Sequence, residues 1–374
     1  MAVQYSSARP ARIGIIGCGN IARRYVAGMA RFPELRLVGC ADRVPELAAS
    51  LAADSGTHAY TAPDRLLADG DVDVVVNITP PLAHATVTVD ALRAGKHVYV
   101  EKPVAATLPD SERMLAEADG AGRLLGAAPD TFLGSAVQTA RAAVDEGLIG
   151  DPVGAVAFVT HSRAETWHPD PSFLFQPGGG PALDLGPYYL TALVTLLGPV
   201  ETVSGATRIG APIRRVTAPD RRVESIEVTT PTHVSGTLRF VSGVLGTVLM
   251  SFDVWDSHLP KIEVYGQQGT LTLPDPNFFD GPVLLKRHED DDWQLLAPIL
   301  PVSGDDEDLS VQLLRGIGVA DLVHALNGDP HRASGRLAQH VLEVLEAMQT
   351  SSDTATVVPI HSRVDRPAPR EGVR

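Results

Sequence analysis

Short apolar runs alternate with helical patterns along the first third of the chain. The strand-like runs lie at residues 12–16, 35–41, 72–78, 97–100 and 124–127. Between them, apolar residues recur at helical spacing at residues 21–31, 45–53, 83–94 and 111–118. The run at 72–78 reads VDVVVNI, which is typical of a strand buried on both faces. This alternation predicts an α/β domain with a doubly wound parallel sheet over residues 10–130.

Strands follow one another in the second part of the chain. After a helical pattern at 136–146, strand-like runs lie at residues 153–161, 234–240, 246–254, 262–265, 270–273 and 283–286. Residues 242–243 and 266–269 look like hairpin connections. We therefore expect an α+β domain over residues 131–360 with a largely antiparallel sheet. Helical patterns at 183–197, 309–327 and 337–348 complete it, and the last two are expected to pack back near the domain interface.

Polar segments at both ends, residues 1–9 and 363–374, are expected to be flexible tails.

The chain has 374 residues and a formal net charge of −14, which disfavours nucleic acid as a partner. It contains no apolar run of about 18 residues, so we expect no membrane span. The two cysteines lie outside metal-ligand or CxxC spacing, and no HExxH motif occurs. We expect a cytoplasmic protein without a bound metal.

A glycine fingerprint opens the first predicted βαβ unit. Residues 14–22 read GIIGCGNIA, a GxGxxA pattern between a strand and a helix. Gly17 permits the tight turn, Gly19 lets the backbone approach a pyrophosphate, and Ala22 allows close packing of helix on strand. The pattern predicts a Rossmann-type dinucleotide site, and we expect its turn to bind the cofactor through Gly17, Gly19, Asn20 and Ile21.

The second predicted strand ends at an acid, Asp42. It lies about 20 residues beyond the fingerprint, where a carboxylate can accept the adenosine ribose hydroxyls. A carboxylate at this position repels the 2′-phosphate of NADP and so favours NAD. The neighbouring Arg43 leaves NADP open, because it could stack on adenine or bind that phosphate.

Two further segments complete a family pattern. Residues 94–103 read AGKHVYVEKP, and residues 178–188 read GGGPALDLGPY. Together with the glycine fingerprint, and in the same order over roughly residues 10–350, they resemble the glucose–fructose oxidoreductase / inositol dehydrogenase / rhizopine-catabolism (Gfo/Idh/MocA) family. The resemblance implies a second domain with a large, mostly antiparallel open sheet. It also implies a sugar or polyol substrate, and a homodimer or homotetramer formed through that sheet.

The resemblance assigns roles around the expected nicotinamide site. Thr79 and Pro80 are expected to contact the cofactor, and His84 and Glu101 are expected to lie nearby as further cofactor-site residues. Lys102 ends a parallel strand, at the edge where open α/β sheets bind ligands. Alone, such a lysine is usually a solvated surface charge. Within the EKP motif, it is expected to reach the reacting hydroxyl, with Glu101 as its positioning partner.

Asp184 and Tyr188 are four residues apart in a segment that we expect to be one helix. This spacing predicts that both side chains lie on one face. The resemblance implies that Asp184 and Tyr188 are both catalytic and contact the substrate. Without it, Asp184 would be read as a helix-terminal charge and Tyr188 as a half-buried aromatic. Many family members have histidine at the position of Tyr188 and an acid at that of Thr191, which weakens an assignment to inositol. A nearby ammonium lowers the pKa of a phenol, so Tyr188 is expected to act as acid/base with Lys102.

Aromatic and imidazole side chains cluster between a predicted strand and the glycine run. They are His161, Trp167 and His168. Loops that join a strand to a catalytic helix often line a substrate pocket. We expect these residues to bind the substrate, although each histidine alone is more often structural.

The sequence therefore favours an NAD(P)-dependent oxidoreductase that transfers a hydride to or from a secondary alcohol of a sugar, glycoside or polyol. Two alternatives stay open. One is a redox-neutral glycosidase or lyase that keeps NAD bound and oxidises C3 transiently. The other is a non-catalytic sensor of a cofactor or sugar.

Overall fold

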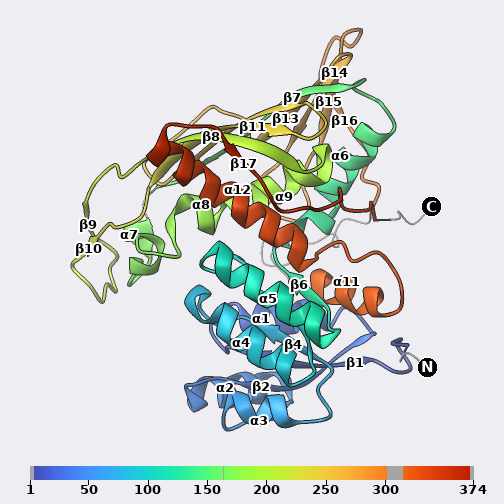
Figure 1. Cartoon of the computed structure of the whole chain (residues 1–374), viewed down its shortest axis with the longest axis vertical. Helices are drawn as coiled ribbons and strands as arrows, with labels where there is room; N and C mark the ends of the chain where they lie inside the picture. Colours follow the sequence, from blue (N-terminus) through green and yellow to red (C-terminus); the bar gives the residue numbers. More distant parts are fainter. Residues whose placement is uncertain (1–3, 163, 301–314, 371–374) are drawn as a thin grey trace. The chain divides into compact units, whose positions relative to one another are not determined.

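The computed structural model describes residues 4–162, 164–300 and 315–370. The chain forms two compact units (Figure 1). The first comprises Met1–Leu133 and Asp306–Gln339, and the second comprises Gly134–Asp305 and His340–Arg374. The sequence predicts one domain over residues 131–360, whereas among the described residues 315–339 belong to the first unit.

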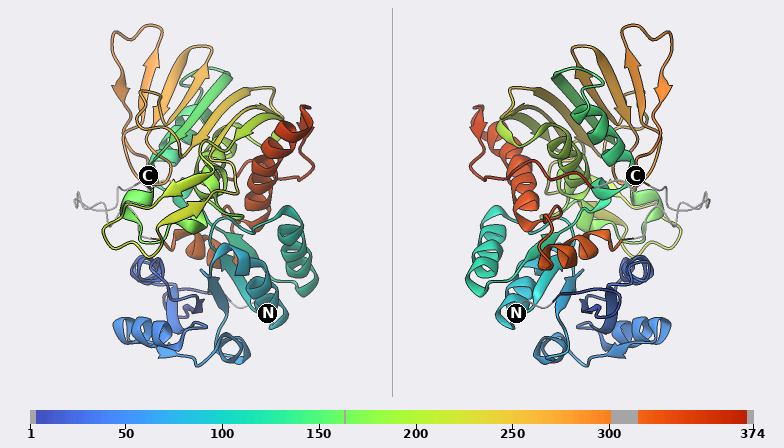
Figure 2. Two further views of the ribbon diagram at one scale, coloured as in Figure 1. Left: turned by 90° about the vertical axis from the view of Figure 1, so that its left-hand side faces the viewer. Right: turned by 90° about the vertical axis from the view of Figure 1, so that its right-hand side faces the viewer.

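The first unit is built on a six-stranded parallel sheet in the order β3-β2-β1-β4-β5-β6. Its strands are β1 (Ala11–Ile16), β2 (Leu35–Ala41), β3 (His58–Ala59), β4 (Val74–Asn77), β5 (His97–Val100) and β6 (Leu125–Ala127). Its connecting helices are α1 (Ala22–Met29), α2 (Pro45–Ser55), α3 (Pro63–Ala68), α4 (Pro81–Arg93) and α5 (Leu108–Ala121), followed by the 3₁₀ turn η1 (Thr131–Leu133). Figure 2 shows the blue helices α1 and α2 and the teal helix α5 on opposite sides of this sheet. The predicted doubly wound parallel sheet is confirmed.

Helix α11 (Ile317–Leu326) joins the first unit from far along the chain. It packs on α1, β5 and β6. The buried carboxylate of Asp130 accepts the backbone N–H groups of Gly316 and Gly318 at 3.2 and 3.1 Å, which fixes the start of the helix. The sequence predicted a helix over residues 309–327, of which 309–314 lie outside the described residues.

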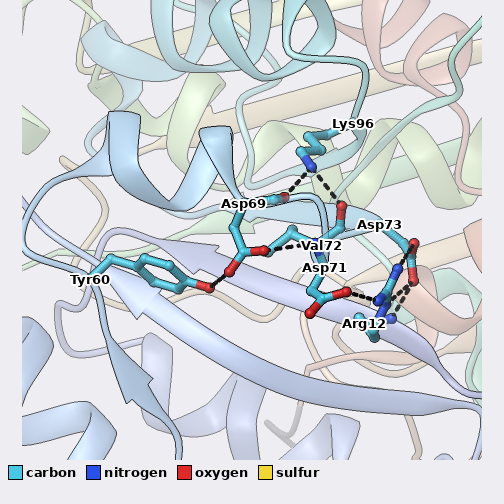
Figure 3. Close-up of polar contacts among 7 residues, drawn as sticks. All are labelled: Arg12, Tyr60, Asp69, Asp71, Val72, Asp73 and Lys96. Atoms are coloured by element: carbon cyan, nitrogen blue, oxygen red, sulfur yellow. Dashed lines mark hydrogen bonds and ion pairs between the residues drawn. The ribbon is translucent and has the colours of Figure 1, made fainter.

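A network of polar contacts surrounds Lys96 of the AGKHV segment in the first unit (Figure 3). The Lys96 side chain is largely buried, and its Nζ donates to the carbonyl oxygens of Asp69 and Val72 at 2.5 and 2.9 Å. Burial lowers the pKa of its ammonium group. On the same turn, the Asp69 carboxylate accepts the Tyr60 hydroxyl at 2.5 Å, and Asp73 accepts the Arg12 guanidinium. Lys96 therefore stabilises the α3–β4 turn.

Replacing Lys96 by methionine is expected to destabilise the first unit by about 2–3 kcal/mol, because two carbonyl groups lose a charged donor inside the protein. Thermal unfolding followed by circular dichroism measures the effect. Lys286→Met is the matched control, because Lys286 also donates to two carbonyl oxygens but at an exposed hairpin. A Lys96→Met protein as stable as the Lys286→Met protein would contradict this role.

The second unit is built on a nine-stranded sheet in the order β16-β15-β14-β13-β7-β12-β11-β8-β17. Its strands are β7 (Pro152–Thr160), β8 (Val200–Arg208), β11 (His233–Phe240), β12 (Leu245–Ser251), β13 (Ile262–Gly266), β14 (Gly269–Leu273), β15 (Leu284–Arg287), β16 (Gln294–Leu295) and β17 (Val358–Pro359). Only β7 and β12 pair in parallel among these described strands, which confirms the predicted open, mostly antiparallel sheet.

Helices cover one face of this sheet (Figure 1). They are α6 (Ser135–Asp145), α8 (Gly180–Asp184), α9 (Gly186–Leu197) and α12 (Gly335–Thr354), of which the last begins in the first unit. Met348 of α12 packs directly on β8 and β11, where Gly205 and Gly236 leave room for it. Side chains on the strands alternate between buried and partly exposed, so the other face of the sheet is open.

Strand β8 was not predicted from the sequence. It reads VETVSGATR, and only Val200 and Val203 are large and buried. Its signal is weak because Ser, Gly and Ala occupy positions that usually carry bulky strand residues. A short hairpin, β9 (Ile213–Arg215) with β10 (Ser225–Glu227), was also missed.

The segments expected as tails make ordered contacts where the structure describes them. The Tyr5 backbone N–H donates to Asn327 Oδ1 at 2.8 Å in the first unit. Arg366 donates to Asp145 at 2.7 Å in the second. No described helix is long and apolar enough to cross a membrane.

His340 of α12 is a buried histidine held neutral by its contacts. Its Nε2 accepts the Val200 N–H at 3.0 Å, and its Nδ1 contacts Ser362 Oγ at 2.8 Å. Burial lowers the pKa of His340 to about 4. A proton on Nε2 would remove the lone pair that accepts the Val200 N–H. Protonation of His340 therefore breaks the hydrogen bond from Val200.

Acid is therefore expected to destabilise the second unit. The pKa of the histidine in the unfolded chain is near 6.5. The contribution of neutral His340 to the stability of the second unit is therefore fully present above that pH. It is lost as the pH falls toward 4, and the loss is about 2 kcal/mol at pH 5. Urea unfolding followed by tryptophan fluorescence measures this unit alone, because Trp167, Trp255 and Trp293 all lie in it. His340→Gln keeps an acceptor for Val200 without titrating, and its stability should fall less between pH 7 and 5. An unchanged loss would contradict the assignment.

Candidate active site

The predicted cofactor residues of the first unit gather at one edge of its parallel sheet. The glycine turn follows β1, Asp42 follows β2, Thr79 follows β4 and Lys102 follows β5. Because all strands run in the same direction, their carboxyl ends meet at this edge, where open α/β sheets bind ligands.

The glycine turn is tight at Gly17 and open at Gly19. Gly17 has φ +101°, and its N–H donates to the Ala41 carbonyl at 3.0 Å. A Cβ on Gly17 would lie 2.7 Å from the Ile78 carbonyl, whereas a Cβ on Gly19 would meet no atom within 4 Å. Ala22 is fully buried at the start of α1, and Asn20 is exposed beside Gly19. These features fit a pyrophosphate that approaches the backbone at Gly19.

Asp42 connects the glycine turn to the following loop. Its Oδ2 accepts the Cys18 N–H at 2.7 Å, and its Oδ1 accepts the Val44 N–H at 2.9 Å. A carboxylate has about four acceptor positions, so both oxygens can still accept ribose hydroxyls. Arg43 is exposed next to it, and its contact with adenine or a 2′-phosphate stays a prediction.

Replacing Asp42 by asparagine is expected to raise the Kd for NAD and to reduce the preference for NAD over NADP by about tenfold. The substitution removes the negative charge that repels the 2′-phosphate, and the repulsion between two like charges close together near a protein surface exceeds the free energy that a tenfold change requires. Titrations of protein with NADH and NADPH, followed by nucleotide fluorescence, give both constants. Asp54→Asn, the same charge change at an exposed ion pair with Arg23, should leave them unchanged. Equal effects of both substitutions would contradict the role of Asp42.

Two buried polar residues fix the turn after β4. Asn77 Nδ2 donates to the His84 carbonyl and to Thr88 Oγ1, both at 3.0 Å, and its Oδ1 accepts the Thr79 hydroxyl at 2.7 Å. The His84 ring is buried between the carbonyl oxygens of Thr79 and Pro103, each 2.8 Å from a ring nitrogen. Burial lowers the pKa of His84. His84 thus braces the Thr79–Pro80 turn against the EKP segment, and direct cofactor contact by Thr79, Pro80 or His84 stays a prediction.

Glu101 is held by two donors in the first unit. Its buried carboxylate accepts the Tyr25 hydroxyl at 3.0 Å and the Lys102 backbone N–H at 2.7 Å. Burial raises the pKa of Tyr25 well above its usual value, so the phenol stays a donor. Glu101 therefore positions the Lys102 backbone, as the EKP motif suggested. Neither Tyr25 nor Asn77 was a candidate from sequence, because a buried donor on a helix and an asparagine at a strand end are usually structural.

The segment with Asp184 and Tyr188 differs from the single helix predicted. Helix α8 ends at Asp184, and α9 begins at Gly186, with Leu185 between them at φ −112°. A Cβ on Gly186 would lie 2.7 Å from Leu345 and 2.9 Å from the Met250 sulfur, so close packing requires glycine there. The prediction of a single helix over residues 183–197 was therefore wrong, and the shared face of Asp184 and Tyr188 stays a prediction. The Gly-Pro pair at 186–187 is a helix-start signal that could have revealed the break. Tyr188 is 5% exposed in the first turn of α9.

The predicted substrate residues of the second unit separate into two groups. Trp167 and His168 stack edge to face with centroids 5.5 Å apart. His161 packs instead on Phe252, at 6.3 Å. Among the described residues, no group of three or more His, Cys, Asp or Glu side chains is arranged to hold a metal ion.

Family models match most of both units. The model described as an oxidoreductase family with an NAD-binding Rossmann fold matches residues 11–128, and the GFO/IDH/MocA C-terminal domain model matches residues 137–272. The chain belongs to the Gfo/Idh/MocA family of oxidoreductases. Residues 11–128 of its first unit form the NAD-binding Rossmann domain of that family, which agrees with the open glycine turn and with Asp42.

Individual relatives within the Gfo/Idh/MocA family include sugar reductases. The 1,5-anhydro-D-fructose reductase of Ensifer adhaerens is 32% identical over 265 residues, or 70% of this chain and 74% of that protein. The dTDP-3,4-didehydro-2,6-dideoxy-alpha-D-glucose 3-reductase of Streptomyces violaceoruber is 36% identical over 200 residues, or 53% of this chain and 58% of that protein. The crystal structure of an NAD binding oxidoreductase from Klebsiella pneumoniae has a TM-score of 0.81 at 25% identity, covering 95% of this chain and all of that one.

Proposed function

We propose that the protein transfers a hydride between NAD and a secondary alcohol or ketone carbon of a sugar, glycoside or related polyol. The observation that carries the proposal is the position of Lys102. It lies at the carboxyl edge of the sheet that also presents the glycine turn, and a buried glutamate fixes its backbone. The names of the two curated relatives support a sugar as substrate.

Bound NAD would supply the hydride acceptor for alcohol oxidation, held by the glycine turn and by Asp42. The protein must then remove the hydroxyl proton. We assign this proton to the Tyr188 phenol oxygen, which acts as base in oxidation and as acid in reduction. The Lys102 ammonium would stabilise the phenolate and orient the reacting hydroxyl. Asp184 would bind a neighbouring substrate hydroxyl. The EKP and GGG motifs support this arrangement.

The proposal can be tested with purified protein, NAD and a panel of free sugars, methyl glycosides and polyols. Accumulation of NADH in equal amount to a keto product is the expected result. Release of the aglycone without net NADH would instead indicate redox-neutral cleavage, and binding without any turnover would indicate a sensor. Either result would overturn the proposed reaction.

The open face of the nine-stranded sheet is the surface that we propose for homodimer or homotetramer formation. Leu245 is 48% exposed at the start of β12, and Leu249 and Phe158, which pair across β12 and β7 on the same face, are half-buried. Burial of such side chains against a second copy is favourable by the hydrophobic effect. Light scattering after size-exclusion chromatography gives the mass in solution. We expect a dimer or tetramer that Leu245→Arg dissociates.

A further inference from the structure

Three aromatic rings form an exposed surface in the second unit, which we name the aromatic platform: Trp167, His168 and Phe173. They come from α7 (Ala164–Trp167), from the loop after it and from η2 (Ser172–Leu174). His168 lies edge to face between the other two, with centroid distances of 5.5 Å to Trp167 and 5.2 Å to Phe173. Trp167 is 58% exposed and Phe173 57% exposed. Large aromatic side chains so exposed often mark a binding surface.

An ion-pair clamp holds the platform segment in place. The Arg214 guanidinium of the β9–β10 hairpin pairs with Glu165 of α7 at 3.0 Å and with Asp253, and it lies 4.8 Å above the Phe175 ring. The backbone N–H groups of Thr217 and Ala218 both donate to the Glu165 carbonyl. The segment is thus fixed from two sides, so a ligand would find the rings already ordered.

The platform is joined directly to the helix that carries Asp184. A Cβ on Gly179 would lie 2.2 Å from the Phe173 carbonyl oxygen, so the glycine run and η2 are in close backbone contact. Helix α8 begins at Gly180 and ends at Asp184. The glycine run that leads into α8 therefore lies against the backbone of the platform segment, within the same unit.

The charges around the platform favour an uncharged ligand group. Among the described arginines of residues 213–222, Arg214 is neutralised by two carboxylates, Arg221 pairs with Glu224, and Arg215 is exposed on the face of β9 opposite to that of Arg214. The charge of Arg222 acts on Asp170, whose pKa is lowered chiefly by its hydrogen bond from Ser172. A diphosphate at the platform would compete with carboxylates for Arg214, Arg221 and Arg222. A neutral planar ring would only need the faces of Trp167 and Phe173.

We propose that the aromatic platform binds the aromatic aglycone of a glycoside substrate. The inference rests on the proposed sugar oxidation and narrows its substrate class. The sugar ring would lie at Asp184 and the aglycone would stack on Trp167 and Phe173.

The test compares phenyl and methyl β-D-glucopyranosides, with the galacto- and xylopyranosides as further pairs, by calorimetric titration of the NAD-bound protein. We expect phenyl glycosides to bind about tenfold more tightly than methyl glycosides, the factor that a stacking energy of about 1.4 kcal/mol gives. Trp167→Ala should abolish the difference and Trp167→Phe should keep most of it. Trp293→Ala is the matched control, because Trp293 is 44% exposed near the β15–β16 hairpin of the same unit and should change nothing.

The inference would be wrong if the wild-type protein bound phenyl and methyl glycosides with equal affinity, or bound neither. It would also be wrong if the preference for phenyl glycosides remained in the Trp167→Ala protein. Tighter binding of uridine diphosphate glucose that Trp167→Ala abolishes would assign the platform to a nucleotide instead. Failure of the proposed function is distinct: phenyl glycosides would bind at the platform, yet no NADH would form with any sugar.

Discussion

Replacing Lys102 by methionine is expected to lower kcat/KM for sugar oxidation by about three orders of magnitude, within the range for loss of a positioned acid–base group. Methionine keeps the length and apolar stem of the side chain but removes the ammonium. The backbone N–H of residue 102 would still donate to Glu101, so the local fold is retained. Steady-state assays of NADH formation measure the loss in kcat/KM. The Kd for NADH should change by less than about threefold, because other residues hold the cofactor.

Lys102→Arg tests whether a positive charge alone is sufficient at this position or whether the compact ammonium group is needed. Arginine restores a positive charge but has a larger, planar head that cannot occupy the same place. We expect it to recover little activity. If Lys102→Met kept more than about a tenth of the wild-type kcat/KM, Lys102 would not contact the reacting hydroxyl, and the proposed mechanism would be wrong.

Most of the first unit could be predicted from the sequence. Buried parallel strands such as β4 carry continuous β-branched runs, and the glycine fingerprint needs both its residue types and its spacing. The same local rules located Asp42 at the end of β2. They did not reveal how Glu101 is held, because Tyr25 reaches it from 76 residues away in sequence. A hydrogen bond of such long range leaves no local pattern.

The second unit was harder to predict for physical reasons that particular residues show. Strand β8 has small side chains because α12 packs closely on Gly205, so its apolar signal is weak. Gly186, which follows the break at Leu185, packs against Leu345, a residue far along the chain that no local pattern indicates. The clamp on the aromatic platform depends on Arg214 of β9 and Asp253 of the loop after β12, which tertiary structure alone brings together. The sequence singled out Trp167 and His168 as substrate candidates, which stays a prediction, but it gave no signal for Phe173 or for the clamp.

Tyr188→Phe is expected to lower kcat by about 100-fold or more, with KM changed much less. The substitution removes one oxygen atom from a side chain that is otherwise buried, so binding surface and packing are retained. Loss of a positioned acid–base group costs about 10²–10⁴ in rate. The pH profile gives an independent readout. Oxidation requires the deprotonated base, so wild-type kcat/KM should rise with pH, and this limb should disappear in Tyr188→Phe.

Tyr189→Phe is the matched control for this substitution. Tyr189 follows in the same helix and is 1% exposed, and burial raises the pKa of its phenol beside Asp275. Removal of this second hydroxyl should leave kcat within about threefold and the pH profile unchanged, since surrounding packing is retained. If both variants lost activity equally, the loss would reflect the packing of α9. If Tyr188→Phe kept its activity and its pH limb, another group would have to accept the proton.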